Sequence, residues 1–159
     1  MIRKVAIKIR GFLVFIWLKL VYGGRFCCQD IPKIRKGISV VIERGACVSV
    51  GKHVFFNNWC SLNSRERIVI GDNCLFGEGV RIYDHNHRFR NPDAPIAEQG
   101  FRCAPVIVGN NCWIGSNVVI LKGVTIGDNV IIGAGCVIDK SVPARTIVRP
   151  AKGEVCSSW

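Results

Sequence analysis

The first 36 residues of the chain are almost without acidic side chains, since only Asp30 stands against nine lysines and arginines. This segment therefore carries a formal charge of +8 of the total of +11, and residues 37–159 are nearly balanced. A basic extension either keeps the surface soluble or meets anionic lipid or another polyanion. It contains no recognisable DNA- or RNA-binding motif, so nucleic acid is not an expected partner.

A long uninterrupted apolar run is also missing from the extension. Its apolar stretch, FLVFIWLKLVY (12–22), has eleven residues and is interrupted by Lys19, whereas a membrane-spanning helix needs about 20 apolar residues. Lys19 also breaks the apolar centre that a signal peptide needs, and no small-x-small cleavage site follows. We expect a basic amphipathic helix within residues 1–25, lying on a membrane surface or packed against a partner subunit.

Cys-x-x-Cys pairs are absent, although the chain has nine cysteines. An odd number of unevenly spaced cysteines does not predict a disulfide framework, and a chain of 159 residues that is 49% apolar can bury a core without one. Without paired cysteines, a structural zinc site is not expected either. We interpret the cysteines as reduced thiols in a cytoplasmic protein of one compact domain.

A six-residue period runs through the second half of the chain. From Val108 the sequence divides as VGNNCW, IGSNVV, ILKGVT, IGDNVI, IGAGCV and IDKSVP. An aliphatic residue opens every unit, and the fifth position is always small or β-branched. Repeats of this kind, with Gly-Asp-Asn corners, are typical of short strands joined by tight turns.

The first half repeats the pattern more loosely. Its units open at Ile38, Arg44, Val50, Phe56 and Leu62, and then, after a slip of two residues, at Ile70, Phe76 and Ile82. Four cysteines occupy fifth positions that elsewhere hold valine, which suits a thiol acting as a small apolar filler. They are Cys60, Cys74, Cys112 and Cys136.

Three such units close a triangular coil, and stacked coils bury the apolar openers as a column, so the pattern predicts an all-β parallel β-helix of four to five coils. A β-sandwich would need longer strands and hairpin turns, which the pattern lacks. We expect the extension to cover residues 1–36 and the β-helix residues 37–152. A loop at 83–107 interrupts the coils, because the spacing from Ile82 to Val108 is not a multiple of six, and a tail follows at 153–159.

The stretch VGNNCWIGSNVVILKGVTIGDNVIIGAGCV (108–137) resembles the signature of hexapeptide-repeat acyltransferases. The resemblance covers residues 38–152 and is strongest to galactoside, maltose and surface-polysaccharide O-acetyltransferases. It implies a left-handed β-helix, a homotrimer with active sites between subunits, and acetyl-CoA as co-substrate. Neither the hand nor the trimer follows from the periodicity.

The expected loop opens with RIYDHNHRFRNPDAP (81–95), which contains His85 and His87. Three interpretations of these histidines are open: they are incidental loop residues, zinc ligands or catalytic groups. The zinc alternative, as in the related γ-class carbonic anhydrases, lacks a third nearby histidine and the His-x4-His spacing, so no metal is expected. Acyl transfer to a hydroxyl needs one general base with a pKa near neutral, which histidine supplies.

The resemblance implies specific roles for these residues. It places His85 as the general base and His87 beside it. Asp84 either holds the ring and stabilises the imidazolium or is a solvated surface aspartate, and the sequence leaves both alternatives open. It also implies that Asn57 contacts the acceptor sugar and that the backbone N–H of Ser116 stabilises the oxyanion. Asn57 is equally expected as a corner residue for backbone reasons.

The resemblance also implies a coenzyme A site along the coils, and cations for its phosphates. The residues expected there are Trp113, Gly115, Gly133, Ala134, Gly135, Lys140, Arg149 and Lys152. The glycines are also required by the corners. The segment VPARTIVRPAKGEVCSSW (142–159) lacks the glycine that usually precedes Pro-Ala-Lys in the family.

These observations predict an O-acetyltransferase that acts on a sugar hydroxyl in polysaccharide or glycan biosynthesis. We expect it in the cytoplasm, with contact to the inner face of the plasma membrane through residues 1–25. Two alternatives stay open: an acetyltransferase for another acceptor (a free sugar, an amino-sugar nitrogen or serine), and a non-catalytic trimeric scaffold.

Overall fold

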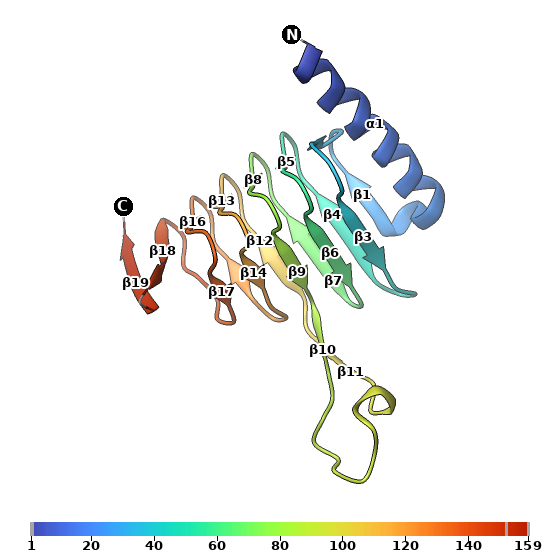
Figure 1. Ribbon diagram of the computed structural model, residues 1–159, viewed down its shortest axis with the longest axis vertical. Helices are drawn as coiled ribbons and strands as arrows, with labels where there is room; N and C mark the ends of the chain where they lie inside the picture. Colours follow the sequence, from blue (N-terminus) through green and yellow to red (C-terminus); the bar gives the residue numbers. More distant parts are fainter. Residues whose placement is uncertain (1, 152, 159) are drawn as a thin grey trace.

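The computed structural model describes residues 2–151 and 153–158. Within these residues the chain forms a stack of three-stranded coils, preceded by the helix α1 (Ile2–Tyr22) and the 3₁₀ turn η1 (Gly23–Arg25). The helix lies across the N-terminal end of the stack, and one excursion projects from its middle (Figure 1). The predicted parallel β-helix of stacked coils is confirmed.

Successive coils build three flat sheets, which we call A, B and C in chain order. Sheet A contains β1 (Phe26–Cys28), β4 (Cys47–Val50), β7 (Arg67–Ile70), β12 (Val106–Val108) and β15 (Thr125–Ile126). Sheet B contains β2 (Lys33–Ile34), β5 (Phe55–Phe56), β8 (Leu75–Phe76), β13 (Trp113–Ile114), β16 (Ile131–Ile132), β18 (Thr146–Ala151) and β19 (Gly153–Ser158). Sheet C contains β3 (Ser39–Ile42), β6 (Ser61–Ser64), β9 (Arg81–Tyr83), β14 (Val119–Ile120) and β17 (Val137–Ile138).

The turns between the sheets form three columns, which we call the A–B, B–C and C–A corners. In the A–B corner, Asp72, Asn110 and Asp128 lie above one another and tie the coils together. The Asp72 side chain accepts from the backbone N–H of Lys52 at 2.7 Å, and that of Asp128 accepts from the backbone N–H of Asn110 at 2.6 Å. The asparagines that follow have positive φ, a conformation that asparagine tolerates better than most residues. The Gly-Asp-Asn repeats are therefore structural.

Coil length explains why the first half of the sequence repeats less clearly. Ile107 pairs with Thr125 one coil later, a spacing of 18 residues. Ser61 pairs with Arg81 after 20 residues, and Phe26 pairs with Val48 after 22. The prediction that Arg44 opens a unit is wrong, because the longer turn leaves Arg44 exposed while Ile42 is buried.

The core is the column of apolar residues inside the coils. Ile114, Ile120 and Ile126 are at most 1% exposed, as the hexapeptide period predicts. The four cysteines at fifth positions are all buried, which confirms them as core residues. Burial raises the pKa of the Cys60 thiol to about 11, so this thiol is poorly reactive.

Helix α1 closes the N-terminal end of the column. Leu18 is 2% exposed and belongs to the core, and the Tyr22 hydroxyl donates to the Val40 carbonyl at 2.9 Å. Gly11 allows the close approach, since a Cβ there would lie 2.5 Å from the Pro32 carbonyl oxygen. Within the described residues, no helix is long and apolar enough to cross a membrane.

Two of the expected boundaries differ from the structure. Strands β1 and β2 lie in the segment expected to be an extension, because they pair in parallel with β4 and β5 and so form the first coil. The β-helix therefore begins near Phe26 rather than at residue 37. Residues 153–158, expected as a tail, form β19, which pairs antiparallel with β18.

The excursion leaves at the C–A corner after β9 and returns at β12. Its stem is an antiparallel pair, β10 (His85–His87) and β11 (Phe101–Cys103), and its tip contains the 3₁₀ turn η2 (Ile96–Glu98). The backbone N–H of Ala104 donates to the carbonyl of Asp84 at 2.9 Å, which closes the base of the excursion. The break in the hexapeptide period therefore does mark a projecting loop (Figure 1).

Candidate functional site

Asp84 and His85 lie at the C–A corner, where the excursion begins. The Asp84 side chain is fully buried and accepts hydrogen bonds from the preceding coil. Its donors there are the Ser64 hydroxyl at 2.7 Å and the backbone N–H groups of Arg65 at 2.8 Å and Glu66 at 2.9 Å. Asp84 is thus a fixed acceptor at the end of sheet C.

These donors keep the carboxylate ionised. Burial on its own would raise the pKa of Asp84, because it removes water from the charged form. The hydrogen bonds from the Arg65 backbone, the His85 ring, the Glu66 backbone and the Ser64 hydroxyl outweigh burial and lower this pKa below its ordinary value. The corner therefore holds a negative charge at neutral pH.

His85 is oriented by this charge. Its Nδ1 lies 3.0 Å from Oδ1 of Asp84, so the carboxylate accepts the Nδ1 proton. The ring is packed edge-on against Phe101, with centroids 5.4 Å apart, and its side chain is 17% exposed. Fixing the tautomer in this way leaves Nε2 with a free lone pair, which is the arrangement that a general base requires.

His87 lies on the same strand but outside this pair. Its ring contacts Phe101 with centroids 4.4 Å apart, and it is exposed. The Arg65 guanidinium lies 3.5 Å from the Phe101 centroid and donates to Glu43 at 3.1 Å. Phe101 is thus held between the histidines of β10 and Arg65 of the preceding coil.

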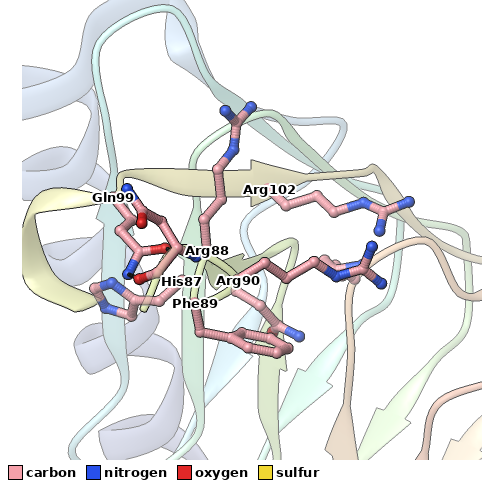
Figure 2. Close-up of a pocket in the computed structure, with 9 residues that line it drawn as sticks. His87, Arg88, Phe89, Arg90, Gln99 and Arg102 are labelled. Carbon is pink, nitrogen blue, oxygen red and sulfur yellow. Dashed lines mark hydrogen bonds between the residues drawn. The ribbon is translucent and has the colours of Figure 1, made fainter. Parts of the chain in front are cut away.

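Beyond His87 the excursion and the next coil enclose a hollow of about 730 Å³, which we call the cationic hollow. In Figure 2, Arg90 and Arg102 extend in the same direction, while Arg88 points away from them. Among the described residues, no carboxylate lines the hollow, so it favours ligands that carry negative charge. It is lined by Asn86, His87, Arg88, Phe89, Arg90, Asn91, Gln99, Arg102 and Lys122.

Asn57 and Ser116 lie at the B–C corner. The Asn57 side-chain oxygen accepts from the backbone N–H of Asn58 at 2.8 Å, so this residue does fill the corner role that was one of its two expected functions. The Ser116 hydroxyl accepts from the backbone N–H of Glu78 at 3.2 Å, and its carbonyl accepts from Gly135 at 2.8 Å. The structure records no acceptor for the backbone N–H of Ser116 among the described residues.

One chain does not bring these two groups of residues together. The B–C and C–A corners are at opposite ends of the strands of sheet C, and from Arg81 to His85 alone the backbone extends on the order of 13 Å. The predicted base and the predicted oxyanion donor therefore cannot meet on one substrate within this chain. A shared site needs the B–C corner of a second copy.

The residues expected to bind coenzyme A also lie at different corners of the coils. Gly115, Gly133, Ala134 and Gly135 lie with Ser116 at the B–C corner, and a Cβ on Gly133 would approach Arg149. Trp113 is 55% exposed on the outer face of sheet B. Lys140 is exposed at the C–A corner, away from this group, and Lys152 lies outside the described residues.

Sequence reasoning missed Ser64, Arg65 and Phe101. Ser64 lies 20 residues before Asp84, which is one coil, so the local repeat would have identified it as the neighbour of Asp84. The arginines of the hollow were visible as RFR (88–90) in the loop. No sequence pattern pointed to Phe101, because the pairing of β10 with β11 does not follow the six-residue period.

The third histidine is far from the other two along the coil perimeter. His53 lies at the A–B corner with φ of 57°, the place that asparagine takes in later coils, and its Nδ1 lies 3.1 Å from Asp30. In the part of the chain that the structure describes, no three His, Cys, Asp or Glu side chains are grouped closely enough to hold a metal ion. His53 is thus a corner residue.

Comparison with known proteins identifies the repeats. Residues 105–140 match the family model for the bacterial transferase hexapeptide (six repeats), and residues 67–82 match the hexapeptide repeat of succinyl-transferase. The chain is 33% identical over 108 residues to galactoside O-acetyltransferase of Escherichia coli K12, which covers 68% of this chain and 52% of that protein. The chain spans about half the length of the curated relatives it matches.

Solved structures agree with the fold. A maltose O-acetyltransferase from Clostridium difficile 630 is 31% identical, with a TM-score of 0.56 over 84% of this chain and 66% of that one. A galactoside acetyltransferase in complex with coenzyme A is 24% identical, with a TM-score of 0.65 over 96% of this chain and 78% of that one. At this identity the second comparison supports the fold alone.

Proposed function

The chain belongs to the hexapeptide-repeat transferase family, and on that premise we propose that it is an acetyltransferase that moves acetyl from acetyl-CoA to a sugar hydroxyl. One observation carries the proposal. His85 is the histidine whose Nδ1 is fixed by a buried carboxylate, and it stands where a cation-lined hollow opens beside the coil. The two relatives with sugar acceptors in their names support the acceptor class.

The proposed step needs one proton to move. Nε2 of His85 takes the proton of the acceptor hydroxyl while its oxygen attacks the thioester carbonyl, so that the C–O bond forms and the C–S bond then breaks. Asp84 stabilises the imidazolium in between, and the imidazolium returns the proton to the leaving thiolate. The backbone N–H of Ser116 from a second copy stabilises the tetrahedral oxyanion.

We propose a homotrimer because this step needs two corners that one chain holds apart. An outward apolar row supports it: Phe55, Leu75, Trp113 and Ile131 are neighbours on sheet B, and Leu75 and Trp113 are 50% and 55% exposed. Exposed apolar rows of this kind mark protein interfaces. The pantetheine arm of acetyl-CoA would then lie along Gly133, Ala134 and Gly135, with Arg149 near its phosphates.

The cationic hollow supports a finer proposal for the acceptor. Its arginines and lysine would hold the phosphate or carboxylate of an acidic glycan, such as a surface polysaccharide or its lipid-linked precursor. We place the reaction in the cytoplasm, where the free cysteines of the described chain stay reduced. Neutral free sugars, amino sugars and serine are the competing acceptors.

A thiol-release assay tests the proposal. The full chain is incubated with acetyl-CoA and, in parallel, with neutral oligosaccharides, acidic oligosaccharides, amino sugars and serine, and each product is identified by mass spectrometry. We expect acetylated oxygen on an acidic glycan. Acetyl-CoA binding without transfer to any acceptor would instead favour the non-catalytic scaffold, and transfer to nitrogen would overturn the sugar-hydroxyl assignment.

A further inference from the structure

Helix α1 has a second apolar face that no other part of the described chain covers. Its inward face, with Gly11, Leu18 and Tyr22, packs on the first coil. The opposite face carries large apolar side chains at intervals of three and four residues, and each is between 38% and 80% exposed. They are Val5, Ile9, Phe12, Leu13, Ile16, Trp17 and Leu20, and we call them the outward stripe.

Basic residues border this stripe. The helix contains five lysines and arginines and no acidic residue. At about 100° per residue, Lys8 and Lys19 lie along one border of the outward stripe and Arg10 along the other. On the first of these borders, an apolar groove between the helix and the first coil is lined by Lys8, Ile9, Phe12, Ile31, Pro32 and Lys33.

An anionic membrane surface has the complementary chemistry. Apolar side chains enter the boundary between headgroups and acyl chains, while long basic side chains reach back to the lipid phosphates. Trp17, which is 54% exposed, has the amphipathic ring that is enriched at this depth. A partner helix would instead need acidic side chains to meet both borders.

From this arrangement we propose that α1 lies in the plane of an anionic membrane, with the outward stripe buried in the bilayer and Lys8, Lys19 and Lys33 against lipid phosphates. The Arg10 guanidinium donates to the Arg35 carbonyl of the first coil, so it adds positive charge beside the stripe without reaching a phosphate. The helix keeps its inward face on the first coil, so the coils stand on the membrane by their N-terminal end (Figure 1). This proposal does not depend on acetyl transfer.

A vesicle flotation experiment tests it with the full chain. The vesicles are phosphatidylcholine alone, or phosphatidylcholine with about one third phosphatidylglycerol, at physiological salt. The parent protein should float with the anionic vesicles and remain below the neutral ones. Leu13→Glu with Leu20→Glu should abolish flotation, because each places a charge in the acyl boundary.

Two further variants separate the apolar and electrostatic parts. Lys8→Gln with Lys33→Gln should weaken binding to anionic vesicles by about fivefold for each lysine removed. Val137→Glu changes an equally exposed apolar residue on β17, 62% exposed, and should float like the parent. Equal melting temperatures would show that the variants are folded.

Three results would overturn the proposal. In the first, the parent protein fails to float with anionic vesicles. In the second, it floats equally with neutral vesicles, which would mean that charge has no role in binding. In the third, the double Glu variant would float as the parent does while its oligomeric state changes in sedimentation, and the outward stripe would then be covered by a second copy of the chain.

Discussion

The regular coils from β12 to β17 and the C–A corner after β9 use the same backbone but treat polar groups in opposite ways. In the coils, side-chain oxygens at the surface accept from backbone N–H groups of the preceding coil, and no ionised side chain from β12 to β17 is buried: Asp128 is exposed. At the C–A corner, the fully buried Asp84 gathers two backbone N–H groups, a hydroxyl and a histidine. The repeat builds the scaffold, and its interruption holds the proposed base.

The difference shows how a rigid repeat can hold a reactive group. A buried carboxylate is tolerated only when its hydrogen bonds are satisfied. The preceding coil supplies those donors from a turn whose position is set by the stacking of the coils. The stacking therefore fixes Asp84, and Asp84 in turn orients His85. Each prediction below changes one of the two regions and leaves the other intact.

The largest effect is expected at the interruption. Removing the proposed base in His85→Ala should lower kcat for the proposed acetyl transfer by about 10²- to 10⁴-fold, the usual contribution of a general base. The free energy of unfolding should change little, because Asp84 keeps its three other donors. His53→Ala, at the A–B corner away from the proposed site, is the control and should retain most of kcat. Normal turnover in His85→Ala would exclude the proposed base.

A core change in the regular coils should affect stability alone. Ile120→Ala removes a fully buried side chain from the column and should cost about 2–5 kcal/mol of unfolding free energy in a urea titration. Val137→Ala lies on the outer face of the same sheet, 62% exposed, and should cost about 0.5 kcal/mol or less. Similar losses for the two variants would contradict the assignment of inward and outward positions.

The smallest effect is expected from Asp84→Asn, and it depends on pH. The amide would face backbone donors with its own NH₂ group, so at pH 7 the variant should lose about 1–3 kcal/mol. The folded-state pKa of Asp84 is lowered, so its stabilisation is present above the unfolded pKa of about 3.9 and is lost as pH falls through the folded value.

Acid titration of stability checks this sign. Parent and Asp84→Asn should differ most at neutral pH, and their unfolding free energies should converge as the pH falls below about 4. Asp93→Asn, an exposed loop carboxylate, is the control and should follow the parent. A constant difference between parent and Asp84→Asn at all pH values would mean that the loss is steric and not due to the charge.

Much of this could be predicted from sequence because the coil is a local, repeated structure. Ile114 and Ile120 are inward for the same reason, so their six-residue spacing identified the core. Arg44 was misplaced because coils of 20 and 22 residues shift the period without changing the fold. His85 could be singled out because it stands where the period stops and where the family resemblance places a base, and its role stays a prediction.

The rest of the site depends on contacts that periodicity does not encode. Ser64 and Phe101 reach Asp84 and His85 from another coil and from the far side of the excursion. The separation of Ser116 from His85 becomes visible only when both are placed on the three corners.

The hydrogen bond between Ala104 and Asp84 closes the excursion at its base. The coils on either side therefore keep the same stacking whatever the length of the chain beyond this bond. Lengthening such a closed segment is inexpensive, since each doubling adds only about 0.6 kcal/mol of closure entropy. A longer or shorter segment between His87 and Phe101 should therefore leave the Asp84–His85 pair in place. For protein engineering, this corner is therefore a place where loops of different length can be grafted onto one scaffold.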